Sequence, residues 1–173
     1  MSQKAGEAHG KVTDKMTSQG KKLFAELQKL AELEVKIGFT TDKKGYDQNH
    51  SSVSADDLED GTTIAHVAAW NEFGTEHIPE RPFMRQSVDK HGDTLLKAAE
   101  QFMGQLAQGK LSADDVMRKV GALQVGFIQH EIDTGNFAEL ADATKKRKDS
   151  TKPLIDTGHM RQSVHYVVKP RKG

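Results

Sequence analysis

The first regular pattern in the chain is an apolar stripe at helical spacing near the amino terminus. Apolar or small residues recur every three or four positions, at Met16, Gly20, Leu23, Leu27 and Leu30. An α-helix has about 3.6 residues per turn, so this spacing places them on one face. The pattern predicts a long amphipathic N-terminal helix, preceded by a flexible N-terminus over residues 1–12.

Two short segments alternate apolar and polar residues, which is typical of half-buried strands. The first follows the N-terminal helix directly and places Val35, Ile37 and Phe39 on one face. The second covers residues 164–168, near the carboxyl terminus. These segments are the natural partners in one sheet, although they lie far apart in the sequence. The expected fold class is α+β, with a small antiparallel sheet packed with three to four helices over one face.

The segment over residues 64–73 is predicted to form a second helix. The sequence Asp-Gly-Thr-Thr over residues 60–63 supplies turn and N-cap chemistry before it, and Gly74 supplies a left-handed glycine stop after it. Its aromatic residues, Trp70 and Phe73, are expected to pack in the core. Exposure of these two side chains at a subunit interface is the alternative.

Two longer helices are predicted to follow. Pro82 suits the first position of one, which ends near residue 108 and has a weak point at Gly92. Ser112 opens the other with a near capping box, and Gly135 ends it. The apolar residues expected to face inward are Val88, Leu95, Ala99, Phe102, Leu106, Val116, Val120, Leu123 and Phe127.

Polar stretches separate these elements. Residues 40–61 contain almost no large apolar side chain and are expected to form a mobile loop, because long loops are functional or disordered more often than packed. Residues 136–152 form a second polar loop that carries a basic cluster. Residues 169–173 follow the last strand as a C-terminal tail. The region between the ends, residues 13–168, is expected to form one α+β domain.

The amino-acid composition limits the kinds of binding partner that the chain is expected to have. Only 35% of the 173 residues are apolar, so the core is lean, which fits either flexible ends and a long loop or a subunit that completes its burial against neighbours. Twenty-five basic and twenty-five acidic residues cancel, which removes any global attraction to nucleic acid or to an anionic membrane. No apolar stretch is long enough to span a membrane, so no membrane partner is expected. The absence of cysteine is compatible with a reducing cytoplasm.

One stretch of the chain carries a recognisable motif. Its pattern is A-x-x-A-x-x-N-E-F-G-T, which starts at Ala65, followed by I-P-x-R-P-F-M-R, which starts at Ile78. A second block, T-K-P-L-I-D-T-G, starts at Thr151. Together these blocks resemble the neck and tail-completion proteins of long-tailed bacteriophages, over roughly residues 33–168.

The resemblance implies a structural role rather than catalysis. Proteins of this family join the tail to the DNA-filled head, and the implied assembly is a closed ring, a hexamer with the symmetry of a tail tube. Its partners would be itself and other neck, connector and tail proteins, in the virion and in the host cytoplasm during assembly. A tail terminator that caps the tail tube is the alternative within the same class. The interface or fold-defining residues carried over are Trp70, Asn71, Glu72, Phe73, Gly74, Thr75, Arg81, Pro82, Phe83, Pro153, Leu154, Asp156, Thr157 and Gly158.

Catalytic and metal motifs are not expected from the sequence. Two Asp-Thr-Gly triplets, at Asp133 and Asp156, suggest an aspartic protease, but the first ends a predicted helix instead of following an apolar strand. The eight histidines never fall into a ligand spacing such as H-E-x-x-H. Phosphate-binding glycine loops are also missing. We therefore expect no enzyme activity, no cofactor and no metal.

A basic cluster offers a rival function. Lys145, Lys146, Arg147 and Lys148 are consecutive, and such a run can bind DNA phosphates in a salt-dependent way. No aromatic residue lies among them, which argues against stacking on bases. The alternatives are a solvated loop, a passing contact with phage DNA, and a small DNA-binding accessory protein.

Overall fold

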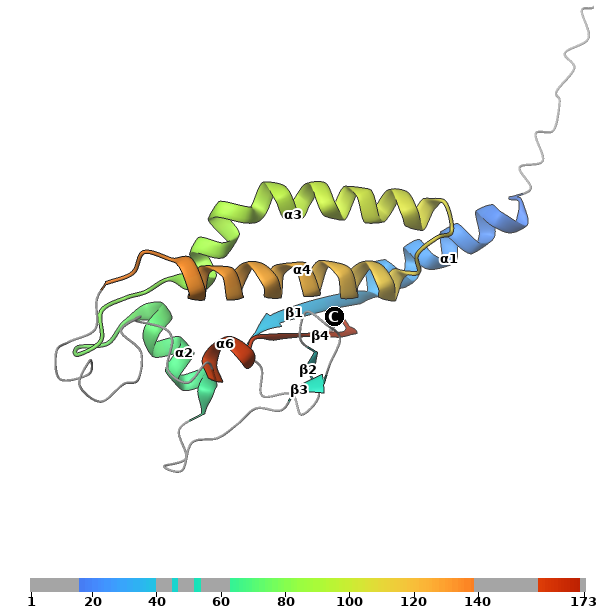
Figure 1. The fold of residues 1–173 in the computed structure, drawn as a ribbon. Coiled ribbons are helices and arrows are strands. Elements are labelled where there is room, and N and C mark those ends of the chain that lie inside the picture. Colours follow the sequence, from blue (N-terminus) through green and yellow to red (C-terminus); the bar gives the residue numbers. More distant parts are fainter. Residues whose placement is uncertain (1–15, 40–44, 47–51, 54–62, 139–158, 172–173) are drawn as a thin grey trace, which may run out of the picture.

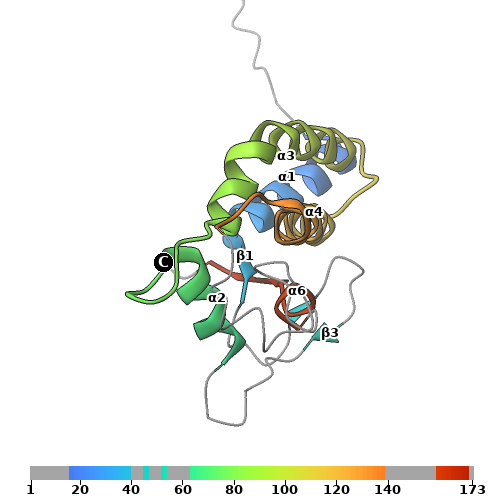
Figure 2. The same cartoon turned by 60° about the vertical axis from the view of Figure 1, so that its left-hand side comes forward.

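The computed structural model describes residues 16–39, 45–46, 52–53, 63–138 and 159–171, and these residues form an α+β fold (Figure 1). A narrow antiparallel sheet lies under one long helix, and a second long helix lies on top of the first (Figure 2). The predicted fold class is therefore confirmed. The described helices are α1 (Ser18–Glu32), α2 (Ile64–Phe73), α3 (Phe83–Ala107), α4 (Ala113–Thr134) and α6 (His159–Gln162).

The two predicted strands are partners. Strand β1 (Leu33–Gly38) pairs antiparallel with β4 (His165–Pro170), in a register that places Ile37 opposite Tyr166. As expected, Val35 and Ile37 turn one face of β1 toward the core. Strand β4 continues through Pro170, so the start of the predicted tail at residue 169 is wrong, because its backbone pairs with the start of β1.

The predicted loop over residues 40–61 contains two strands that the sequence did not indicate. Strand β2 (Gly45–Tyr46) and strand β3 (Ser52–Val53) extend the sheet to the order β1-β4-β2-β3. Tyr46 pairs with Tyr166 across the second edge of β4. Each strand has two residues, too few for an alternating pattern to be visible. The other residues of that range, and residues 1–12, lie outside the described part of the chain.

Helix α4 is the central element of the fold. One side of it packs on β1 and β4, and the other side packs on α3 (Figure 2). Of the positions predicted to face inward, Val116 is buried and the others in α4 are half-buried. The most buried side chains lie on the face toward the sheet, including Val125, Ile128 and Ile132. A helix that is covered on two sides has no single apolar stripe. For this reason the spacing of apolar residues in the sequence underestimated how much of α4 is buried.

Helix α3 differs from the prediction at Val88. This side chain is 56% exposed, and Ser87 takes the buried position instead. The Ser87 hydroxyl donates to the backbone carbonyl of Met84 and accepts from the Gln124 amide of α4 at 2.9 Å. A hydrogen-bonded serine therefore faces α4 where the apolar periodicity predicts valine.

The helix boundaries agree with the predicted capping signals in most cases. Thr63 accepts a hydrogen bond from His66 N, and Ser112 forms a capping box with Asp115. Pro82 is the residue before α3 and not its first helical residue. Gly135 ends α4, as predicted; its backbone is extended, with φ −60°, and its N–H bonds the carbonyl of Glu131.

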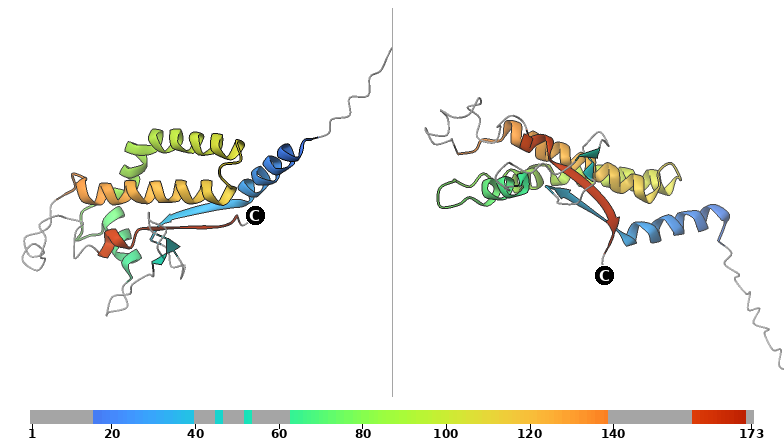
Figure 3. Two further views of the ribbon diagram at one scale, coloured as in Figure 1. Left: turned by 45° about the vertical axis from the view of Figure 1, so that its right-hand side comes forward. Right: turned by 90° about the horizontal axis from the view of Figure 1, so that it is seen from below.

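Helix α1 is joined to the start of β1 and extends from there away from the body of the molecule (Figure 3). Its predicted stripe is only partly covered, because Leu23 and Leu30 are half-buried whereas Met16 and Leu27 are exposed. Phe24 is exposed on the same helix. An amphipathic helix with much of its apolar surface uncovered is therefore present at one end of the molecule.

A close contact in the core joins α4 to the sheet. Tyr166 of β4 is fully buried and its ring lies against the backbone of α4 at Gly121. A Cβ atom at Gly121 would meet Tyr166 Cγ at 2.6 Å, which is well below van der Waals contact. The absence of a side chain at Gly121 sets the distance between the central helix and the sheet.

We predict that Gly121→Ala destabilises the protein by about 1–3 kcal/mol, because overpacking the core outweighs the helix propensity of alanine. Gly92→Ala is the matched control, since a Cβ there meets nothing within 4 Å in a helix interior. Alanine at Gly92 should stabilise by about 0.5–1 kcal/mol. Urea unfolding followed by circular dichroism measures both changes, and equal effects at the two glycines would contradict the tight contact.

Candidate functional site

The motif that carries the family resemblance forms the connection between α2 and α3, which we call the α2–α3 corner (residues 70–85). Gly74 ends α2 with φ +72°, and a Cβ atom there would lie 3.1 Å from Glu80 N and from Ile78 O. Both the backbone conformation and the lack of space therefore require glycine. The chain then turns through Thr75, whose N–H bonds the carbonyl of Ile78 at 2.8 Å.

Glu72 is the centre of the corner. It belongs to α2, is buried, and accepts hydrogen bonds from the backbone N–H groups of Met84 at 2.9 Å and Arg85 at 3.1 Å. These groups belong to the first turn of α3, where helical N–H groups have no partner within the helix. Pro82, at the N-cap position, provides no side-chain cap. The carboxylate of one helix therefore caps the next, where the helix dipole favours a negative charge.

Arg85 holds the same carboxylate from the outside. Its Nε donates to Glu72 Oε1 at 3.0 Å, and its guanidinium also donates to the backbone carbonyl of Glu72 and to the carboxylate of Glu80. Hydrogen bonds to Glu72 and then Glu80 raise the pKa of Arg85 above its ordinary value. Glu72 and Arg85 therefore form an ion pair within the chain.

Arg81 is buried on the inner side of the corner. Its guanidinium donates to Asn71 Oδ1 at 3.1 Å and to the backbone carbonyl of Ala138 at 2.8 Å. Burial lowers the pKa of Arg81 below its ordinary value. Its own backbone N–H bonds the carbonyl of Asn71 at 2.7 Å. Arg81 therefore joins α2 to the segment that follows α4, and the next motif residue, Phe83, is fully buried in the core.

The two aromatic residues of α2 are on the surface. Trp70 is 43% exposed and Phe73 is 70% exposed, so the expected core packing of these side chains is wrong. The positions of α2 that face the core are Ile64, Ala68 and Glu72, which leaves Trp70 and Phe73 outside that face. The Arg85 guanidinium lies over the Phe73 ring at 5.5 Å. The alternative of aromatic exposure agrees with the structure.

An apolar groove runs beside Phe73. We call it the corner groove; it has a volume of about 610 Å³ and lies between α2, β1 and the start of α3. Small side chains of α2 form one wall, and the ends of Ile37 and Met84 form others. The residues that line it are Lys36, Ile37, Phe39, Ala65, Ala68, Ala69, Glu72, Phe73, Met84 and Arg85. A buried anchor thus supports an exposed aromatic residue at the edge of an apolar depression.

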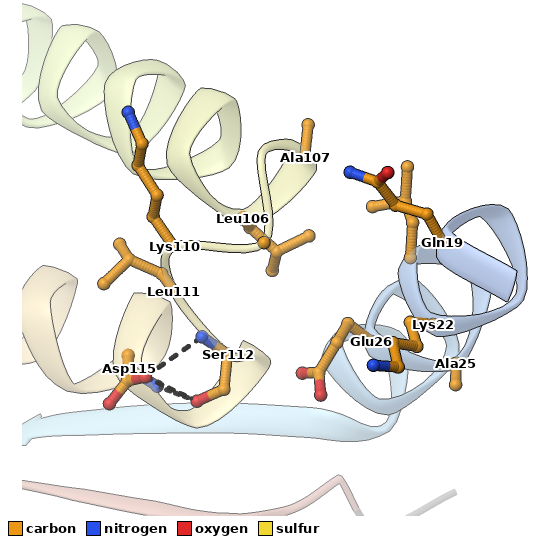
Figure 4. A pocket seen from close by; sticks show the side chains of 12 residues that line it. Gln19, Lys22, Ala25, Glu26, Leu106, Ala107, Lys110, Leu111, Ser112 and Asp115 are labelled. Atoms are coloured by element: carbon orange, nitrogen blue, oxygen red, sulfur yellow. Dashed lines mark hydrogen bonds between the residues drawn. The ribbon is translucent and has the colours of Figure 1, made fainter.

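A second pocket lies at the other end of the molecule, between α1 and the turn from α3 to α4 (Figure 4). Its volume is about 510 Å³. On its floor Glu26 of α1 accepts from the backbone N–H of Ala113 at 2.6 Å, and Ser112 hydrogen-bonds Asp115. These hydrogen bonds from Ser112 lower the pKa of Asp115. The carboxylates in this pocket serve the start of α4, so it is a structural junction.

Several predicted site residues lie outside the described part of the chain. These are the second block, Pro153, Leu154, Asp156, Thr157 and Gly158, and the basic cluster, Lys145, Lys146, Arg147 and Lys148. Asp133 of the other Asp-Thr-Gly triplet is described, and its carboxylate accepts from Arg161 Nε at 2.8 Å. Asp133 and Arg161 therefore form a structural ion pair at the end of α4.

One group of side chains able to hold a metal was missed by sequence reasoning. His91 of α3 and His130 and Glu131 of α4 place their ligand atoms within 4.8 Å of one another. They come from two helices and are separated by about forty positions, so no local spacing indicated them. This group lies between α3 and α4, away from the α2–α3 corner.

Comparison of the chain with protein-family models, with curated proteins and with solved structures found no match. Among the described residues, no helix is long and apolar enough to cross a membrane.

We predict that Glu72→Ala lowers the free energy of unfolding by about 2–3 kcal/mol, because the first turn of α3 loses a charged acceptor in a buried site. Glu72→Gln retains one acceptor oxygen and should lose less. Glu80→Ala is the control, since it also removes a carboxylate from Arg85 but is half-exposed and contacts no helix terminus. Exposed ion pairs contribute little, so its stability should stay close to that of the unchanged protein.

Chemical denaturation of the three variants at one pH and salt concentration gives the comparison. Equal losses for Glu72→Ala and Glu80→Ala would show that the capping of α3 by Glu72 does not stabilise the corner.

Proposed function

We propose that this chain is a structural virion protein of the phage head-to-tail interface, a neck or tail-completion protein that assembles as a ring. The proposal starts from the resemblance of the two sequence blocks to that family. It is supported by one observation above all, the combination of a rigid hydrogen-bonded corner with exposed aromatic side chains. It assigns no catalytic step to the chain.

The corner suits a subunit contact for two physical reasons. Its backbone is fixed by buried polar groups, so binding there costs little ordering of the chain. Its outer surface presents Trp70 and Phe73, and exposed aromatic residues are enriched at protein interfaces. The corner groove lies beside them and is lined mainly by apolar atoms. An apolar surface of this kind commonly marks an interaction site.

The position of a second apolar surface favours a ring. Helix α1 exposes Phe24 and Leu27, Met16 just before the helix is also exposed, and α1 lies at the opposite end of the molecule from α2 (Figures 1 and 3). Two different surfaces at opposite ends can contact each other head to tail between copies. Such heterologous contacts close into a ring when the rotation between subunits allows it. The lean apolar composition of the chain is in keeping with burial that is completed between subunits.

We predict that the full chain forms a closed oligomer, and that the double variant Trp70→Ser with Phe73→Ser remains monomeric. The reason is that both substitutions remove exposed aromatic area without touching the hydrogen bonds of Glu72. Light scattering after size-exclusion chromatography measures the mass, and negative-stain microscopy shows whether rings form. Leu96→Ser is the matched control, because Leu96 is also an exposed apolar residue but lies on α3 away from the corner.

Rings for the control and monomers for the double variant support the proposal. A full chain that stays monomeric at high concentration, or a double variant that assembles as well as the unchanged protein, contradicts the role of the corner.

The function itself is tested by electron microscopy of a lysate in which this gene alone is silenced in its parent phage and restored from a plasmid. Full heads beside separate tails of normal length indicate the joining role. Tails of uncontrolled length indicate the terminator. Intact infectious particles without the protein would contradict the proposal and favour the accessory DNA-binding alternative.

A further inference from the structure

A cluster of metal-ligating side chains lies between the two long helices, and the proposed virion function does not use it. His91 extends from α3, and His130 and Glu131 are neighbours near the end of α4. Glu131 is buried, His91 is partly buried, and His130 is exposed. The cluster therefore spans the boundary between the interior and solvent, where an ion can enter and still be held by a buried carboxylate.

The buried carboxylate is held in position by two different partners. Glu131 Oε2 accepts from Lys90 Nζ at 2.6 Å, while Glu131 Oε1 lies 3.3 Å from His91 Nε2. One oxygen is thus occupied by a lysine and the other faces the imidazole. Hydrogen bonds that orient a ligand in this way are typical of the residues that surround metal sites.

The imidazole of His91 is also held in place. Its ring stacks on Phe127 at 4.4 Å between centroids and with 9° between planes, and the ring of His130 lies edge-on at 5.7 Å. Stacking on Phe127 restricts the rotation of the His91 ring, so Nε2 keeps its direction toward Glu131. Two imidazoles and a carboxylate, each from a helix, are the donor set of many zinc sites.

The distances fit the size of a zinc ion. Two ligand atoms at about 2.0–2.1 Å from a tetrahedral Zn²⁺ lie about 3.3 Å apart. His91 Nε2 and Glu131 Oε1 are 3.3 Å apart, and the His130 ligand atom lies within 4.8 Å of both. A rotation of the exposed His130 side chain would bring its ring nitrogen to about the 3.3 Å separation from the other two ligand atoms that a tetrahedral zinc ion requires. The less exposed His91 and Glu131 side chains need no large movement.

A depression leads to this place from the surface. It has a volume of about 380 Å³ and is lined by His91, Ala122, Leu123, Gly126, Phe127 and His130. Both histidines therefore border a space that is open to solvent, which provides a path of entry for an ion and room for a water molecule as the fourth ligand.

We propose that His91, His130 and Glu131 bind one zinc ion that links α3 to α4. On binding, the neutral imidazole of His91 coordinates the ion through the lone pair of Nε2 and carries its proton on Nδ1. The ion would add a direct link between α3 and α4, the central helix of the fold. The site stands independently of the proposed virion function, because it lies away from the α2–α3 corner.

Titration of the metal-free full chain with zinc chloride by isothermal calorimetry tests the site. We expect one strong site per chain and a rise in Tm on adding zinc. His130→Ala should weaken zinc binding by about tenfold or more and remove the rise in Tm, because a ligand is lost. His130 is exposed, so this variant should fold normally without metal. Replacing zinc with Co²⁺ should give the visible absorption of a tetrahedral ion in the unchanged protein.

His77→Ala is the matched control, because His77 is an exposed histidine in the turn after α2, away from the cluster. This variant should bind zinc as tightly as the unchanged protein does. His91→Ala provides a second variant on the other helix and should weaken binding as His130→Ala does. An unchanged protein that binds no zinc overturns the proposal. The same conclusion follows if His130→Ala and His91→Ala bind zinc as tightly as His77→Ala does.

Discussion

The hydrogen bonds from the start of α3 to the carboxylate of Glu72 are the interaction on which the arrangement of this protein depends. A helix that begins after a proline at its N-cap position leaves its first N–H groups without a capping side chain of its own. Glu72 supplies the acceptor from α2, and this fixes where α3 starts and how it is oriented against α2. The same orientation leaves Trp70 and Phe73 pointing outward from the corner. The buried carboxylate of Glu72 therefore contributes both to the folding of the chain and to the proposed assembly surface.

A similar device appears at the other end of the molecule. Glu26 of α1 accepts from the first N–H of α4, and Lys29 of α1 pairs with Asp114 in the first turn of α4. Asp114 raises the pKa of Lys29, as expected for an ammonium group beside a carboxylate. Carboxylates of one helix thus serve the amino terminus of another at both ends of the α3–α4 pair. In a chain with few apolar residues, such directional contacts specify the packing that a larger core would otherwise fix.

The parts of the fold that depend on local patterns were predictable from the sequence. Alternation over Val35 to Phe39 identified β1, and capping residues such as Thr63 and Ser112 located helix starts. The pairing of the first and last strands followed because they are the two segments with a clear strand pattern. These features rest on a few neighbouring residues, so one sequence contains enough information to find them.

The remaining features depend on contacts between distant residues. Val88 appeared to be a core residue, but Ser87 occupies that position because Gln124 of α4 bonds its hydroxyl. Strands β2 and β3 are formed by pairing with β4 and have no pattern of their own. Trp70 and Phe73 resemble core residues in composition, and only the orientation of α2 places them on the surface. For the same reason, no spacing in the sequence could indicate that His91 lies beside His130 and Glu131.

Hydrogen exchange of individual backbone amides, followed by nuclear magnetic resonance, tests most directly whether Glu72 caps α3. First-turn amides of a helix normally exchange quickly, because they have no partner within the helix. If Glu72 binds them as described, the amides of Met84 and Arg85 should exchange as slowly as those in the middle of α3. Rapid exchange at both positions, beside a protected helix interior, would show that the carboxylate does not hold the start of α3 and that the corner is not the rigid element described above.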